Sequence, residues 1–296
     1  MSSNVKEAEE TLLKDAEVLM MDNVIFPQIA DSVPNLRWAQ GSWAGVEGLV
    51  HYFNDKTKPA YPVTRMAGES FSLLMAEYVL SNIILHERGF RKVFTNQSEK
   101  KWDTSGNIHN YRSLQDLNVA ILGLGNIGKE VARTLKTFHS TIHAYTRKKP
   151  SPDNISKYVD QYWHTGELSQ LLAQCDYIVS ILPSTKDTKS LLGINNLRQT
   201  KKHPVLINIG RGDVVNCDDI CTAIEEGFLS HAILDVFETE PLPTDSPLWN
   251  NPKITITPHV AGVSRPQDVA FTFLENYQRF LDGRPLLNKI DWDTGY

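Results

Sequence analysis

The stretch from Leu117 to Lys149 reads LNVAILGLGNIGKEVARTLKTFHSTIHAYTRKK, and it decides the fold. Residues 118–122 form a short apolar run that predicts a buried strand. From 129 to 139 the apolar residues recur at helical spacing, and 141–145 predicts a second strand. Strand, glycine-rich turn, helix and second strand follow one another in the order of a dinucleotide-binding unit.

The turn after the first strand carries three glycines in the pattern Gly-x-Gly-x-x-Gly. The first glycine permits a tight turn, the second lets the backbone approach a pyrophosphate, and the third lets helix and strand pack closely. The N-terminus of the helix would then bind the diphosphate. A glycine-rich turn without a ligand is the alternative, which the flanking strands disfavour. The residues predicted to hold the cofactor here are Gly123, Gly125, Asn126, Ile127 and Gly128.

The end of the second strand indicates which dinucleotide is bound. An NAD site has an acidic residue about 20 residues past the glycines, where it accepts hydrogen bonds from the ribose. Here the tip contains Thr146, Arg147, Lys148 and Lys149, and no acid. An arginine fork with a nearby lysine can hold a 2′-phosphate, which a carboxylate would repel. We therefore expect NADP rather than NAD, the alternative being a solvated basic loop.

Composition restricts the class of protein. With 296 residues, 41% hydrophobic and 22% charged, the chain is long enough for two domains. A formal charge of −5 gives no basic surface for nucleic acid, and no apolar run reaches the length of a membrane span. Three cysteines are too few for a disulfide framework, and Cys217 and Cys221 have no histidine beside them to make a metal site. A cytoplasmic enzyme without a metal is the expectation.

The rest of the chain alternates strands with helices. This alternation predicts an α/β fold with a doubly wound parallel sheet and right-handed crossovers. The polar segment 91–116 reads as a connection, and 66–90 reads as a long helix. Further helices are predicted at 25–30, 168–172, 218–226 and 266–282, and further strands at 16–21, 36–40, 176–182, 205–209, 231–237 and 254–259.

A loop of small residues, 41–49, follows the carboxyl end of a predicted strand. Ligands of α/β sheets bind at such ends, and exposed backbone amides there can hold a carboxylate. A plain tight turn is the competing interpretation. Arg65, just before the long helix, is a candidate substrate contact, and a surface charge is its alternative.

Arg211, Glu240 and His259 each follow the carboxyl end of a different predicted strand. In a parallel sheet these ends share one edge, beside the glycine loop. Arg211 offers a planar fork for a carboxylate, and His259 can give a proton to an oxygen that becomes an alkoxide as hydride arrives. Glu240 beside the imidazole would orient it and favour its charged form. Asp235, at the end of its strand, is expected to face the nicotinamide.

On these residues the chain resembles the D-isomer-specific 2-hydroxyacid dehydrogenase family, and within it the glyoxylate/hydroxypyruvate reductases. The resemblance implies that Arg211, Glu240 and His259 form the catalytic set. It also implies a substrate-carboxylate loop at Ala44, Gly45 and Val46. The motifs that carry it are 123–128, 182–188, 208–212, 234–242 and 257–259, and they place further cofactor contacts at Leu182, Pro183, Thr188, Ile209 and Asp235.

The resemblance further implies reduction of a small 2-oxo acid by NADPH in a homodimer. A dinucleotide domain, 89–265, would be inserted into a smaller flavodoxin-like substrate domain made of 1–88 and 266–296. The family has a strand and a helix ahead of Ala16, so the small sheet is expected to lack its first strand. Alanine is commoner in the family at the position of Gly210.

Two other functions fit the same fold. One is a dinucleotide-sensing interaction module, as corepressors of this fold are, and the other is an NAD-dependent phosphoglycerate-type dehydrogenase. The complete Arg211, Glu240 and His259 set disfavours the first. The absence of an acid near Thr146 disfavours the second.

Overall fold

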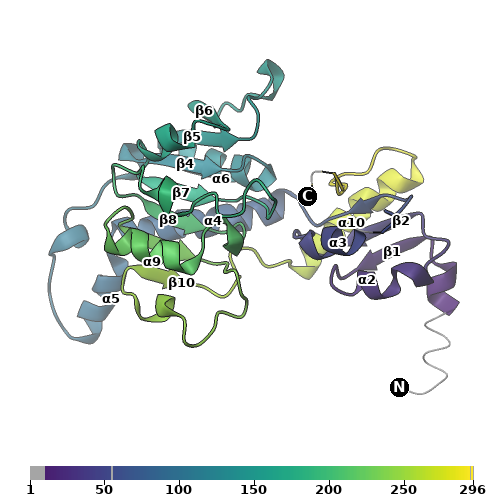
Figure 1. Ribbon diagram of the computed structural model, residues 1–296, viewed down its shortest axis with the longest axis horizontal. Coiled ribbons are helices and arrows are strands. Elements are labelled where there is room, and N and C mark those ends of the chain that lie inside the picture. The colour runs from purple at the N-terminus through teal and green to yellow at the C-terminus, as the bar shows by residue number, and fades with distance from the viewer. Residues whose placement is uncertain (1–10, 55, 294, 296) are drawn as a thin grey trace. The chain divides into compact units, whose positions relative to one another are not determined.

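The computed structural model describes residues 11–293 except 55, together with residue 295. The chain forms two compact units, one made of Met1–Phe71 and Ser264–Tyr296 and the other of Ser72–Val263 (Figure 1). The second unit therefore takes in most of the long helix that the sequence assigned to the substrate domain. The predicted domain organisation remains a prediction. Among the described residues, no helix is both long and apolar enough to cross a membrane.

The described residues of the larger unit contain a seven-stranded sheet in which every pair of neighbours is parallel. Its order is β10-β9-β8-β7-β4-β5-β6, so the order reverses beside β4, the strand that leads into the glycine loop. The predicted parallel, doubly wound sheet is confirmed. The strands are β4 (Asn118–Leu122), β5 (Thr141–Thr146), β6 (Gln161–His164), β7 (Tyr177–Ser180), β8 (Val205–Asn208), β9 (His231–Leu234) and β10 (Ile254–Ile256).

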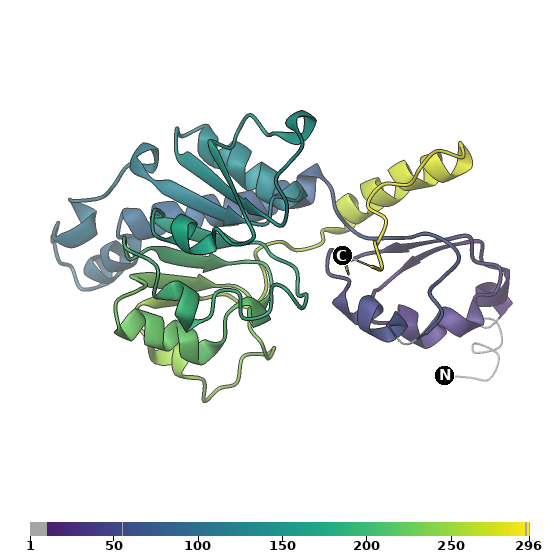
Figure 2. The ribbon, with the colours of Figure 1, turned by 45° about the horizontal axis from the view of Figure 1, so that its top comes forward.

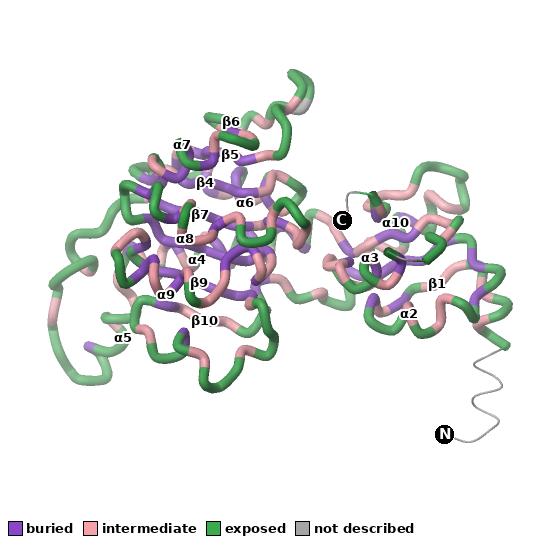
Figure 3. Tube along the Cα trace, in the orientation of Figure 1, coloured by how far each residue is buried: buried purple, intermediate pink, exposed green. Residues whose placement is uncertain are grey.

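Helices cover both faces of this sheet, as its apolar strands require. One face packs against α7 (Leu168–Leu172), α8 (Ile194–Leu197) and α9 (Cys217–Glu225). Figure 2 shows α4 (Glu69–Glu87) and α6 (Asn126–Lys136) on the opposite face. The strands β7, β8 and β9 are buried at every position, as their colour in Figure 3 shows. These buried strands make the sheet a rigid support for the loops at its ends.

The smaller unit holds a parallel sheet of β1 (Val18–Met21), β2 (Trp38–Gly41) and β3 (Val63–Thr64), in that order within the described residues. One face packs against α2 (Phe26–Ile29) and α3 (Glu47–Phe53) through Phe26, Leu49 and Phe53. On the other face Trp38 stacks on Phe273 of α10 (Pro266–Leu281), with ring centroids 5.2 Å apart. A flavodoxin-like arrangement of this unit remains a prediction.

Several segments differ from the sequence interpretation. The supposed connection 91–116 contains α5 (Phe90–Ser98) and two short 3-10 turns, Gly106–Ile108 and Leu114–Asp116. Helix α5 buries only Asn96, so it lacks the apolar stripe by which helices are recognised. The last three residues of loop 41–49 belong to α3, and the edge strand β6 is too polar to be predicted from its pattern.

A polar network lies at the amino-terminal end of the large sheet, and we call it the amino-end network: Glu87, Arg112, Asp176 and Tyr177. Arg112 donates to Glu87 through Nη2 (2.6 Å) and Nε (3.1 Å), and to Asp176 through Nη1 (3.1 Å). The hydroxyl of Tyr177 donates to Glu87 at 2.7 Å. Burial raises the pKa of Glu87, but the bonds from Arg112 and Tyr177 outweigh it, and the pKa lies below its usual value. The carboxylate is thus charged and internally paired.

Two histidines lie beside this network, His86 on α4 and His231 at the start of β9. Their ring centroids are 4.9 Å apart, and Nε2 of His231 contacts the hydroxyl of Thr255 at 3.0 Å. Burial lowers the pKa of His231 to about 3, assisted by the charges of His86 and Arg91. His231 is therefore neutral in the folded chain at ordinary pH.

Candidate active site

The glycine loop has the geometry that a dinucleotide requires. Gly123 has φ +99°, which only glycine adopts without strain. A Cβ on Gly128 would lie 2.1 Å from the carbonyl oxygen of Gly123, so glycine is needed for α6 to approach the strand. A Cβ on Gly125, in contrast, would meet nothing within 4 Å. The space at the first turn of α6 is therefore open, and the amides of Asn126 and Ile127 are those that would hold a diphosphate there.

The basic tip of β5 has an ordered backbone and exposed side chains. Thr146 donates from Oγ1 to the carbonyl of Lys148 at 2.9 Å, and Thr165 donates to the carbonyl of Arg147 at 3.2 Å. Arg147 and Lys148 are exposed, and β5 is the neighbour of β4. The two cations therefore lie at the end of the strand next to the glycine loop, where the ribose of a bound dinucleotide is expected.

The other predicted cofactor residues shape the loops around this site. Leu182 and Ile209 are buried, and Leu182 lies next to Gly123. Thr188 donates from Oγ1 to the carbonyl of Pro183 at 2.6 Å and accepts from the amide of Thr185 at 2.9 Å. Its hydroxyl thus closes the loop that follows β7. Their contact with a cofactor remains a prediction.

Arg211, Glu240 and His259 follow β8, β9 and β10, three adjacent strands, and we call these residues the rim. Arg211 donates from Nη1 to the carbonyl of Gly210 at 2.7 Å. A Cβ on Gly212 would lie 1.9 Å from the carbonyl carbon of Phe237, so the segment after β8 packs directly on the one after β9. A Cβ on Gly210 would approach the carbonyl oxygen of Leu182 to 2.7 Å, which explains glycine at this position.

Glu240 and His259 form a hydrogen-bonded pair. Nδ1 of His259 lies 2.7 Å from Oε2 of Glu240, whose Oε1 accepts from the amide of Phe237 at 2.9 Å. Because a carboxylate only accepts, Nδ1 carries the proton that joins the pair, and Nε2 is the atom left for a ligand. The side chains of His259 and Glu240 are 48% and 35% exposed, so the pair is accessible to a bound molecule.

Asp235 supports the segment that carries His259. Its carboxylate is buried and accepts from Oγ1 of Thr257 (2.5 Å), from the amide of Val260 (2.9 Å) and from that of Ala261 (2.9 Å). Its carbonyl accepts from the amide of His259 at 2.8 Å. The sequence placed Asp235 beside the nicotinamide, and this contact remains a prediction. The sequence did not predict this structural role, because no local motif indicates that the Asp235 carboxylate binds the residues on either side of His259.

In the smaller unit, the predicted carboxylate loop is held by its carbonyl groups. Nδ2 of Asn23 donates to the carbonyls of Gly45 (2.6 Å) and Trp43 (3.4 Å), and Arg65 donates to that of Ala44 (3.1 Å). In a trans peptide the next N–H points opposite to the carbonyl. The amides that follow Trp43 and Gly45 therefore both point away from Asn23.

The predicted substrate residues differ in what they could offer to a ligand. Ala44 and Val46 would offer backbone amides, because the side chain of Val46 packs in the core. Arg65 contacts the loop itself. Asn23, buried beneath the loop, was not predicted, and only its position a few residues after a strand could have drawn attention to it.

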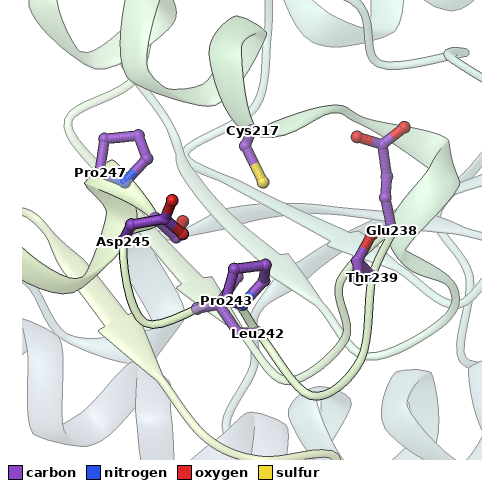
Figure 4. Close-up of a pocket in the computed structure, with 8 residues that line it drawn as sticks. Cys217, Glu238, Thr239, Leu242, Pro243, Asp245 and Pro247 are labelled. Atoms are coloured by element: carbon purple, nitrogen blue, oxygen red, sulfur yellow. The ribbon is translucent and has the colours of Figure 1, made fainter.

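A pocket of about 290 Å³ lies behind the loop that carries Glu240. Its lining includes Cys217 of α9, Thr239, Leu242 and Asp245, and Figure 4 shows their side chains around it. The rim residues are not among its lining. Burial raises the pKa of the Cys217 thiol, so this sulfur is a poor nucleophile. Within the described part of the chain, no three His, Cys, Asp or Glu side chains are grouped to hold a metal ion.

The fold and the rim define a dinucleotide-dependent oxidoreductase. The profile of the D-isomer specific 2-hydroxyacid dehydrogenase NAD-binding domain matches residues 80–261, more than half of the chain. The chain therefore belongs to the D-isomer specific 2-hydroxyacid dehydrogenase family.

Individual relatives extend the match beyond that domain. Glyoxylate/hydroxypyruvate reductase A of Escherichia fergusonii is 29% identical over 256 residues, 86% of this chain and 80% of that protein. A family structure from Aeromonas salmonicida is 36% identical, with a TM-score of 0.85 over 97% of this chain and 89% of the other. The NADPH-dependent glyoxylate/hydroxypyruvate reductase of Sinorhizobium meliloti, in complex with NADP and sulfate, is 26% identical, with a TM-score of 0.84 over 98% and 89%.

Proposed function

We propose that this protein reduces glyoxylate or hydroxypyruvate with NADPH to the D-2-hydroxy acid. The hydrogen bond of 2.7 Å between Glu240 and His259 carries the proposal, since it leaves Nε2 free to give a proton. The side chains of Glu240 and His259 are about half-exposed. Glu240 follows β9 and His259 follows β10, and Arg211 follows β8, the neighbour of β9. A corepressor-like module needs no such proton donor.

The residues divide the chemistry as follows. When bound, the nicotinamide supplies a hydride to the carbonyl carbon of the substrate. Arg211 holds the carboxylate and polarises the carbonyl with its planar fork. His259 donates the proton from Nε2 to the carbonyl oxygen, and Glu240 keeps the ring in place and offsets its charge. The amides of Ala44 and Val46 bind the carboxylate of the substrate.

The preference for NADPH rests on the tip of β5. Arg147 and Lys148 are exposed there, and the tip contains no carboxylate that would repel a 2′-phosphate. The reductase from Sinorhizobium meliloti, which is similar in fold, is described as NADPH-dependent.

Initial rates with each cofactor test this preference. We expect NADPH oxidation with glyoxylate and hydroxypyruvate, and Arg147→Ala to raise the KM for NADPH about tenfold, because a charge-assisted bond of roughly 1.4 kcal/mol is lost. The KM for NADH should not change. Lys157→Ala, an exposed cation elsewhere on the unit, serves as the control. Faster turnover of NADH with a phosphorylated 2-oxo acid would instead support the phosphoglycerate-type enzyme, and no turnover would support the interaction module.

We further propose a homodimer acting in the cytoplasm. Phe94, Trp102 and Tyr111 are 58%, 99% and 45% exposed along one segment of the larger unit. Exposed aromatic residues of this kind are typical of protein interfaces. Light scattering should give twice the chain mass, and Trp102→Glu should give the monomer.

A further inference from the structure

A line of three side chains leads from helix α4 to the segment that carries His259. Oη of Tyr78 lies 2.6 Å from Oγ1 of Thr257, which lies 2.5 Å from Oδ1 of Asp235. The same carboxylate accepts from the amides of Val260 and Ala261, both at 2.9 Å. The segment is therefore held at the side chain of Thr257, two residues before His259, and at the two amides that follow His259.

The direction of the hydrogen bonds follows from counting protons. A buried carboxylate only accepts, so the single proton of the Thr257 hydroxyl points to Asp235. Tyr78 must then be the donor in its bond to Thr257. Burial raises the pKa of Tyr78 to about 12, so its hydroxyl keeps this proton at ordinary pH. Tyr78 thereby fixes which way the Thr257 hydroxyl points.

The held segment is strained. His259 has φ +53°, a left-handed conformation that is uncommon for residues other than glycine. Such a conformation persists only where the surroundings determine it. Here its amide donates to the carbonyl of Asp235 at 2.8 Å, and the carboxylate of the same residue binds the two following amides. If these bonds loosen, the imidazole moves away from its partner Glu240.

We propose that Tyr78 is a positioning residue for the reaction, acting through Thr257 and Asp235 on the conformation of His259. The bond of Tyr78 is to Thr257, which is 179 residues away in sequence, and not to a residue of the rim. The catalytic meaning of this role rests on the proposed function, whereas the effect on the backbone does not.

The first test is Tyr78→Phe, which removes the hydroxyl and keeps the ring. We expect kcat to fall about tenfold, because a misplacement of a catalytic group by a fraction of an ångström has effects of this order. The KM for the 2-oxo acid should stay within about twofold, since no substrate contact is lost. Amide hydrogen exchange of residues 259–263 should become faster at the same time.

Tyr177→Phe is the matched control. It removes a buried tyrosine hydroxyl from the same unit, at the opposite end of the sheet, where it binds Glu87 at 2.7 Å. It should lower the stability of the chain without a change in kcat or in the amide exchange of residues 259–263. If both variants lose kcat in proportion to their lost stability, Tyr78 is merely structural and the proposal is wrong.

Thr257 shows whether the effect passes along the line. Thr257→Ser keeps the hydroxyl and should keep kcat, whereas Thr257→Val should lower it. Once Thr257 is valine, adding Tyr78→Phe should have no further effect on kcat, because the link is already broken. Multiplied losses in the double variant would contradict the proposal.

Hydrogen exchange separates this proposal from the proposed function. If the wild-type chain oxidises no NADPH with any 2-oxo acid, the proposed function fails, and the amide exchange of residues 259–263 still decides the role of Tyr78. Faster exchange in Tyr78→Phe and Thr257→Val, but not in Tyr177→Phe, supports it. Unchanged exchange in Tyr78→Phe overturns it.

Discussion

The two ends of the seven-stranded sheet carry polar clusters of different kinds, and helix α4 reaches both. At the carboxyl end Tyr78 binds Thr257, and Glu240 and His259 are 35% and 48% exposed. At the amino end Glu87 binds Tyr177 and Arg112, and its side chain is 4% exposed. Buried pairs of this kind serve structure, whereas a proton donor must reach its substrate. Exposure therefore distinguishes the candidate site from the internally paired cluster within one sheet.

The largest expected effect belongs to the carboxyl end. His259→Gln removes the proposed proton donor, and kcat for NADPH oxidation with hydroxypyruvate should fall about 10³-fold, within the range of general acid catalysis. Stability should be unchanged, because the imidazole is half-exposed. His109→Gln, an exposed histidine of the same unit, should do neither. If His259→Gln keeps more than a tenth of the wild-type kcat, the exposed cluster at the carboxyl end does not differ in function from the buried cluster at the amino end.

The next effect belongs to the amino-end network. Arg112→Met leaves the buried carboxylate of Glu87 without its cation, so the free energy of unfolding should fall by about 3 kcal/mol. Turnover at 25 °C should not change. Arg133→Met, which breaks a pair with Glu130 on the surface of α6, should lower stability by less than about 1 kcal/mol. Denaturant unfolding measures the stability of both variants. A loss of kcat in Arg112→Met, under conditions where this variant is fully folded, would show that the amino-end network contributes to activity.

A smaller effect concerns acid pH. His231 has a pKa of about 3 in the folded chain, below its ordinary value of 6.5. As the pH falls below 6.5 the unfolded chain gains a proton that the folded chain gains only near pH 3, so stability decreases across this window. At pH 5 the decrease should be about 2 kcal/mol. His231→Gln should flatten the dependence of the unfolding free energy on pH, and an unchanged slope would refute the assignment.

The sequence predicted the parts of the fold whose pattern is local. Residues 118–122 and 205–209 are mostly apolar runs, typical of strands buried on both faces, and each contains a strand of the sheet. Helix α5 and strand β6 were missed because they bury few apolar residues. Their formation depends on neighbours that no local pattern records.

The candidate site was predictable to a similar extent. Motifs at strand ends indicated Arg211, Glu240 and His259, since parallel strands bring their carboxyl ends to one edge. The supports of the site were not predictable, because Tyr78 and Thr257 are distant in sequence, and Asn23 has no motif. Such bonds depend on how α4 packs on the sheet and how the loop after β2 folds back, which only the structure shows.

The kcat of NADPH oxidation with hydroxypyruvate, measured for the wild-type chain and for Glu240→Ala, tests the central claim most directly. If the Glu240 and His259 pair delivers the proton, the wild-type chain turns over and Glu240→Ala lowers kcat by roughly a hundredfold, because Nδ1 of His259 loses the carboxylate that lies 2.7 Å away and holds the ring. A folded wild-type chain that oxidises no NADPH, or an unchanged kcat in Glu240→Ala, would contradict the account.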